Sequence, residues 1–194
     1  KSGDTQYSLI RLAKIITAFT IGHSVSLFLG AMKWLLLPQQ PVEIAIAITI
    51  LITAIHTIKP LFFGKEIYIV AGFGLIHGLA FSTVLSEMNL DSREMMYSIL
   101  GFNVGIELVQ LFVVFCTMPW ILILSKKKNF YCLRIGGAGI AILSSLAWLL
   151  ERISGHTNIV SKMVEQIALQ GKWLIALLAV SALLSIKKKK KENV

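Results

Sequence analysis

The stretch from Tyr97 to Leu124 reads YSILGFNVGIELVQLFVVFCTMPWILIL. Only one of its side chains, that of Glu107, is charged. A helix needs roughly 20 mostly apolar residues to cross the hydrocarbon core of a bilayer, and this stretch exceeds that length. Because the stretch is apolar on nearly every side, it predicts a helix that spans a membrane.

The whole chain has the same character. Of its 194 residues 56% are hydrophobic and only 15% are charged, and the mean hydropathy is +0.76. Soluble domains average about 45–50% apolar and 25% charged residues. The composition therefore excludes a soluble globular enzyme. The net charge of +9 does not indicate a nucleic-acid partner, because the Lys and Arg residues form short clusters between apolar runs.

Six apolar stretches have the length of a span or nearly so. They cover residues 9–29, 42–58, 67–85, 97–124, 133–150 and 172–186. The sequence thus predicts an all-α fold, a polytopic integral membrane bundle of about six transmembrane helices. We expect this bundle to occupy residues 1–186 and a basic cytoplasmic tail to follow at residues 187–194. Residues 151–162 are expected to connect the fifth span to the sixth.

The basic residues are distributed unequally between the two sides of such a bundle. If the six spans alternate in direction, fourteen Lys and Arg residues lie on one side and five on the other. Cytoplasmic loops of membrane proteins are enriched in Lys and Arg. We therefore expect both termini in the cytoplasm and place the protein in a bacterial cytoplasmic membrane.

Ionisable side chains within the spans are few. His23 and His77 fall near the middle of the first and third spans, and Glu107 falls near the middle of the fourth. A charge within the membrane is costly unless it pairs or faces water, so each such residue is a functional candidate. We expect His23, His77 and Glu107 to face one cavity between these three helices.

Other polar residues accompany these three. Asn103 and Gln110 share a helical face with Glu107, since the three stand at i, i+4 and i+7. Ser24 adjoins His23, while His56 and Glu43 lie near the cytoplasmic and outer ends of the second span, where they can mark an exit and an entrance. Small-x-x-x-small pairs let helices approach closely, and two of them are expected to pack the third span on the fourth: Gly74 with Gly78, and Gly101 with Gly105.

Four segments, in this order, resemble the HupE/UreJ family of hydrogenase and urease accessory membrane proteins. They are AFTIGHSVSL at residues 18–27, VEIAIA at 42–47, FGLIHGLAF at 73–81 and GFNVGIELVQL at 101–111. The later WLLER at residues 148–152 is similar to the end of the family pattern. The resemblance covers roughly residues 15–152.

Members of that family are regarded as permeases or facilitators for nickel and cobalt. The resemblance implies that His23, His77 and Glu107 bind a divalent transition metal ion (Ni, or Co or Zn), with Ser24, Glu43, His56, Asn103 and Gln110 in supporting positions. It also implies partners in metalloenzyme maturation, beside the lipid bilayer. One departure is that the family's upstream helix, rich in His and Asp, has no counterpart before Lys1. Either that helix lies outside this sequence or this member functions without it.

Two other classes of function fit the same residues. In an intramembrane metal-dependent hydrolase, the His and Glu side chains would hold zinc with an activated water, and Ser24 or Glu107 would assist. In a non-catalytic subunit of a larger complex, the polar residues would only pack. Tightly retained metal with a lipid-side groove favours the hydrolase, and a polar path that reaches both faces favours transport.

Overall fold

The computed structural model describes residues 5–87, 91–127 and 130–192. Its helices are α1 (Thr5–Ala31), α2 (Gln39–Ile58), α3 (Glu66–Glu87), α4 (Ser92–Ser125), α5 (Phe130–Ser154), α6 (Ile159–Ala168) and α7 (Gly171–Glu192). The all-α class expected from the sequence is confirmed.

Polar side chains set the start of two helices. The Asp91 carboxylate accepts from the backbone N–H groups of Arg93 and Glu94 at 2.9 and 2.8 Å, and the Glu94 carboxylate accepts from the Asp91 N–H in return. Asn158 accepts from the Ser161 N–H at 2.8 Å and so caps α6. These bonds replace the carbonyl partners that amides in a first helical turn lack.

Glycines allow α1 and α3 to pack in backbone contact. A Cβ atom on Gly22 would lie 2.1 Å from the carbonyl oxygen of Ala71, and one on Gly74 would lie 2.2 Å from that of Phe19. At Gly78 the Cβ would lie 2.2 Å from the carbonyl oxygen of His23. Because Gly22, Gly74 and Gly78 have no side chain, α1 and α3 can come into contact next to His23 and His77.

The expected partner of the α3 glycines was wrong. Gly74 and Gly78 pack on α1, whereas a Cβ on Gly101 or Gly105 of α4 would meet nothing within 4 Å. A small-x-x-x-small pattern states that a helix can approach a neighbour closely, but it does not say which neighbour. In this structure α1 is the helix that packs closely on Gly74 and Gly78.

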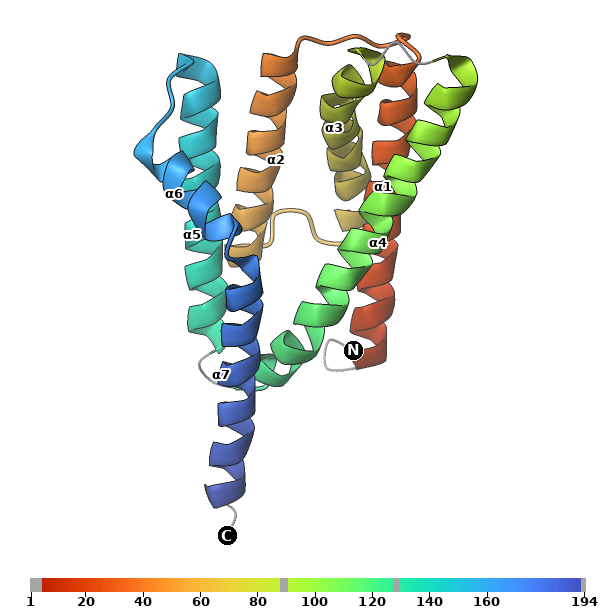
Figure 1. The fold of residues 1–194 in the computed structure, drawn as a ribbon. Coiled ribbons are helices and arrows are strands. Elements are labelled where there is room, and N and C mark those ends of the chain that lie inside the picture. Colours follow the sequence, from red (N-terminus) through yellow and green to blue (C-terminus); the bar gives the residue numbers. More distant parts are fainter. Residues whose placement is uncertain (1–4, 88–90, 128–129, 193–194) are drawn as a thin grey trace.

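The helices are arranged so that α1 packs mainly on α3 and α2 mainly on α5 (Figure 1). Helix α4 runs obliquely across the bundle and reaches α7 at its lower end. The start of α1, the start of α5 and the end of α7 lie toward the same end of the bundle, and the α2–α3 connection lies nearer its mid-height. The α1–α2 and α5–α6 connections lie at the opposite end.

The number of candidate spans in the structure agrees only approximately with the expectation of about six. Among the described residues four helices, α1, α2, α4 and α5, are long and apolar enough to cross a membrane. Helices α6 and α7 bend by 68° at a short break and make a fifth span if they are counted together. Of α3, the described apolar stretch Glu66–Ser82 is not counted among these four helices.

The segment after the fifth span departs from the expectation of a plain connection over residues 151–162. Helix α5 continues to Ser154, and α6 begins at Ile159. The sequence explains why α6 exists: its apolar residues recur with helical spacing, and Asn158 supplies a cap. Helix α7 continues through residues 187–192, so the basic segment up to Glu192 is an extension of the last helix.

Candidate functional site

His23 lies on the face of α1 that packs into the bundle and is only 2% exposed. Three aromatic rings surround its imidazole, with centroids 6.0 Å (Phe19), 6.0 Å (Phe81) and 6.2 Å (Phe102) from its own. The Phe102 ring is stacked on the imidazole at an interplanar angle of 19°. His23 is thus held rigidly among apolar side chains from three helices.

Asn103 of α4 lies beside His23. Nδ1 of His23 is buried and has no hydrogen-bond partner. The Asn103 amide is itself oriented, because its Nδ2 donates to the Ile99 carbonyl at 3.0 Å and its Oδ1 accepts from Ser24 Oγ at 2.8 Å. His23 therefore has a buried Nδ1 that no protein group engages.

The imidazole of His77 of α3 is oriented by Thr49 of α2. Nε2 of His77 lies 3.0 Å from Thr49 Oγ1. The single hydroxyl proton of Thr49 is already donated to the carbonyl oxygen of Ile46 at 2.7 Å. Since Oγ1 can then only accept from the imidazole, Nε2 of His77 is the donor and Nδ1 carries the lone pair.

The two imidazoles flank one aromatic side chain. The ring of Phe19 lies 6.0 Å from that of His23 and 5.3 Å from that of His77, between centroids. Nε2 of His77 bonds a neutral oxygen, and Nδ1 of His23 is buried without a partner. A neutral imidazole whose other nitrogen is fixed by a hydrogen bond is the arrangement in which histidine binds a metal ion.

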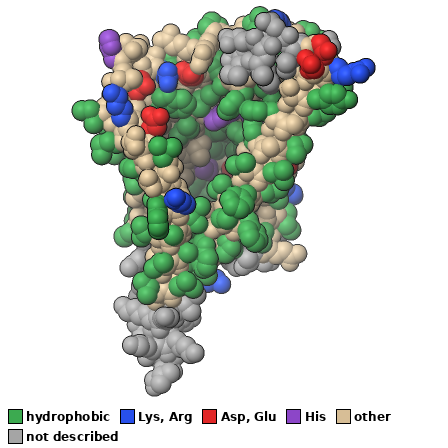
Figure 2. All heavy atoms as spheres, viewed as in Figure 1, with side chains coloured by type: hydrophobic (Ala, Val, Ile, Leu, Met, Phe, Trp, Pro, Cys, Tyr) green, Lys and Arg blue, Asp and Glu red, His purple; other side chains and the backbone are tan. Residues whose placement is uncertain are grey.

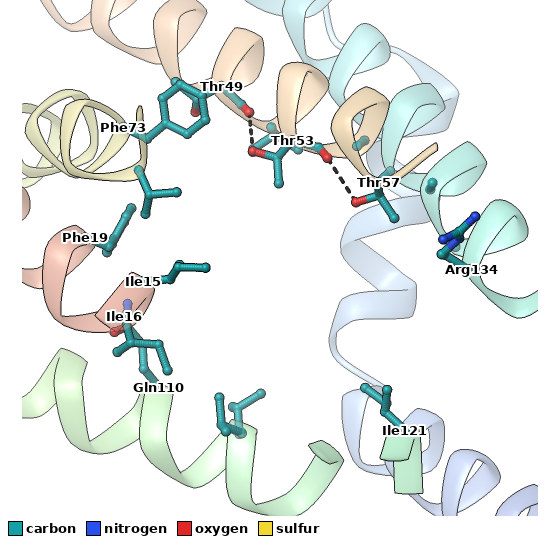
Figure 3. Close-up of a pocket in the computed structure, with 18 of the residues that line it drawn as sticks. Ile15, Ile16, Phe19, Thr49, Thr53, Thr57, Phe73, Gln110, Ile121 and Arg134 are labelled. Atoms are coloured by element: carbon teal, nitrogen blue, oxygen red, sulfur yellow. Dashed lines mark hydrogen bonds between the residues drawn. The ribbon is translucent and has the colours of Figure 1, made fainter. Parts of the chain in front are cut away.

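A cavity of about 930 Å³ opens beside His77. The space-filling view shows this face hollowed between α4 and the α7 side of the bundle, with histidine inside the hollow (Figure 2). The residues Ile15, Ile16, Phe19, Thr49, Thr53, Thr57, Phe73, Gln110, Ile121 and Arg134 are labelled around the cavity in Figure 3. Oε1 of Gln110 is buried and has no hydrogen-bond partner, so a second unused polar atom lies in the same wall.

Glu107 is not brought to this place. Its side chain is exposed on α4, and the residue is not among those that line the cavity. Within the part of the chain that the structure describes, no three His, Cys, Asp or Glu side chains form a group that could hold a metal ion. The structure therefore places His23 and His77 beside Phe19 and puts His77 and Gln110 in the cavity wall, whereas Glu107 lies apart from that wall.

Ser24 and His56 have other hydrogen-bond partners. The hydroxyl of Ser24 donates to Asn103, so it forms no nucleophile–base pair with an imidazole, and the hydrolase interpretation gains no support. Nδ1 of His56 accepts from the backbone N–H of Leu61 at 2.9 Å, and its ring stacks on Phe62 with centroids 4.3 Å apart. His56 thus closes the turn after α2.

Glu43 takes part in an ion pair at the opposite end of the bundle. Its Oε2 lies 3.1 Å from Nε of Arg152, and its Oε1 accepts from Nε2 of Gln39 at 2.8 Å. Gln40 adds a bond of 2.7 Å to the carbonyl oxygen of Arg152. These contacts join the start of α2 to the end of α5, away from the histidines.

Two contributors to the site lay outside the predicted set. Thr49 forms part of a polar row with Thr53 and His56 at i, i+4 and i+7, and this row was the available signal. Arg134 lines the far end of the cavity but lies among basic residues that a topology argument explains equally well. Only the tertiary structure separates it from its basic neighbours.

Comparison with known proteins gives one match. A family model described as HupE / UreJ protein matches residues 5–152, which include α1 to α4 and nearly all of α5. Helices α6 and α7 lie outside the matched range. No curated protein sequence and no solved structure matches the chain.

Proposed function

Since the chain belongs to the HupE/UreJ family and is an integral membrane protein, we propose that it is a permease or facilitator for nickel or a similar divalent transition metal ion. The family is linked to nickel and cobalt handling, and its accessory role in metalloenzyme maturation supports metal as the substrate. The proposed binding residues are His23 and His77, with Asn103 and Gln110 beside them.

The observation that carries this proposal is the pair of imidazoles beside Phe19. His23 and His77 lie in adjacent helices at this one ring, Nδ1 of His23 is buried without a partner, and Nε2 of His77 lies 3.0 Å from Thr49 Oγ1. Imidazole nitrogen is a preferred ligand for Ni, Co, Zn and Cu. A packing role would leave no reason for a buried Nδ1 without a partner, because such atoms cost free energy in an apolar interior.

The ligand set suits transport better than storage. Two imidazoles and two amides carry no formal charge, so they attract a divalent cation less strongly than a set with carboxylates. A binding site along a transport path must also release its ion. We propose that a metal ion stops between His23 and His77 on its way through the bundle.

Uptake of nickel and cobalt into proteoliposomes tests this function. The double variant His23→Ala, His77→Ala should lose nearly all uptake seen in the parent, because no other described imidazole lies in the bundle interior with a free nitrogen. Each variant should melt within a few degrees of the parent in detergent. His156→Ala, in the exposed α5–α6 connection, is the matched control and should transport like the parent.

Two outcomes would contradict the proposal. One is uptake by the double variant at the level of the parent. The other is a parent that moves neither metal under a gradient. Glu107→Gln is the informative third variant: from its exposed position outside the cavity wall we expect it to bind metal like the parent.

We also propose that both termini lie in the cytoplasm, because fourteen of the nineteen Lys and Arg residues belong to the side that carries them. The α5–α6 connection should then face outward. A cysteine placed at Thr157, in a variant without Cys116 and Cys132, should react with an impermeant thiol reagent added to intact cells. Reaction only after the membrane is permeabilised would reverse the orientation.

A further inference from the structure

The large cavity has a lining that a metal path does not explain. Most of its wall is aliphatic or aromatic, from Ile15 and Phe19 of α1 to Leu178 of α7. Its polar groups are a few: three threonines, His77, Gln110 and Arg134. The hydroxyls of Thr53 and Thr57 donate to carbonyl oxygens of their own helix, at 2.8 and 3.0 Å, so they contribute little to the polarity of the space.

A cavity of this kind in a membrane will hold something apolar. Apolar cavities exclude water and take up apolar molecules instead. The volume of about 930 Å³ is at the upper end of the range of ligand pockets, about 300–1,000 Å³. The cavity is open at the face seen in Figure 2, where hydrophobic side chains dominate the rim. The hydrocarbon around the bundle is therefore the nearest supply of an occupant.

Arg134 indicates which class of lipid this cavity can bind. Arg134 lies in the second turn of α5 and lines the cavity at the end of the bundle where the chain termini lie (Figures 1 and 3). Its guanidinium lies 5.6 Å from the ring centroid of Tyr131, and no acidic side chain among the described residues forms an ion pair with it. Lys126, at the end of α4, adds positive charge at the same end.

We propose that this cavity binds an acyl chain of an anionic phospholipid, with the phosphate of that lipid on Arg134. The chain would lie along the apolar wall between α4 and α5 toward His77. Guanidinium groups bind phosphate oxygens through paired hydrogen bonds. An anionic lipid has a net negative charge that attracts the guanidinium, whereas the choline of phosphatidylcholine offsets the charge of its phosphate. The proposal does not rest on the metal, because it is argued only from the apolar lining of the cavity and from Arg134.

Two glycines of α5 supply a matched pair of variants. Gly137 lines the cavity, and a Cβ there would meet nothing within 4 Å, so Gly137→Leu adds side-chain volume at an open point of the cavity wall. Gly136 is its neighbour in the same helix and also has open space at its Cβ, but it is not part of the cavity wall. Gly136→Leu therefore matches the change in helix propensity and in apolar surface.

The experiment measures lipid bound to the full chain after purification in detergent. Phosphatidylglycerol and phosphatidylcholine are titrated separately and counted by native mass spectrometry. Arg134→Gln should raise the dissociation constant for phosphatidylglycerol about fivefold, the ratio that corresponds to roughly 1 kcal/mol for one basic residue at an anionic surface. It should leave phosphatidylcholine unchanged, and Arg134→Lys should keep most of the preference.

The controls decide between a site and general attraction. Lys126→Gln removes a charge at the same end from outside the cavity wall and should cause a smaller change than Arg134→Gln. Gly137→Leu should lose bound lipid of both kinds, and Gly136→Leu should not. The proposal is overturned if Arg134→Gln and Lys126→Gln behave alike, if the two leucine variants retain equal lipid, or if a second copy of the chain replaces lipid in the spectra.

Discussion

Replacing Gly74 by alanine should destabilise the protein, although alanine is the better helix former. The added Cβ would lie 2.2 Å from the carbonyl oxygen of Phe19 and 3.0 Å from the backbone nitrogen of His23. Both neighbours are backbone atoms, so α1 and α3 must move apart. Overpacking of this kind costs about 1–3 kcal/mol. We expect a lower melting temperature in detergent and weaker metal binding, because His23 and His77 lie on the two helices that separate.

Gly105→Ala is the matched control for this prediction. Gly105 also lies within a long apolar helix and in a small-x-x-x-small pair, but a Cβ there would meet nothing within 4 Å. Its replacement should be neutral or should stabilise by up to about 1 kcal/mol, the propensity difference between glycine and alanine. Equal melting temperatures for the two variants would show that the contact between α1 and α3 is looser than described.

This contrast shows what the sequence could and could not predict about the fold. The runs of apolar residues predicted the helices, since a span needs only length and composition. The glycine pairs predicted close packing, and the sequence correctly located it on α3. The partner helix could not be predicted, because a stripe of small residues allows close packing against any neighbouring helix. The short helix α6 was missed because a polar connection and a brief amphipathic helix differ mainly in their cap, here Asn158.

The candidate site was predictable in part for a related reason. A histidine in the middle of an apolar span is conspicuous by its cost, and His23 and His77 do lie together around Phe19. The same argument selected Glu107, yet its helix turns that side chain outward, while Asn103 and Gln110, three or four residues away, face the bundle. At 3.6 residues per turn, positions i, i+4 and i+7 span about a sixth of a turn, and helix rotation decides which edge of this stripe is buried. The rotation of a helix about its axis is set by its packing against other helices, so the sequence of that helix alone does not predict it.

Replacing Thr49 by valine should weaken metal binding while the bundle stays folded. Valine keeps the shape of threonine but removes the oxygen that accepts from Nε2 of His77 at 3.0 Å. The imidazole would then be free to rotate or to change tautomer. Loss of such an orienting partner typically lowers metal affinity 10–100-fold. The measurement is the affinity for nickel by isothermal titration, beside a melting curve for each variant.

Thr53→Val separates this effect from a general loss of polarity in the cavity. Thr53 is one turn further along α2 and lines the same cavity, and its hydroxyl donates to the Thr49 carbonyl oxygen at 2.8 Å, as the Thr49 hydroxyl donates to that of Ile46. The two substitutions therefore remove equivalent helix bonds, and only one removes a histidine partner. We expect Thr53→Val to bind nickel like the parent. In the metal-free protein, ¹⁵N NMR should find the His77 proton on Nε2, and in Thr49→Val that preference should disappear. A proton on Nδ1 in the parent would mean that His77 has no lone pair to offer at that atom, and the metal would then have to bind elsewhere.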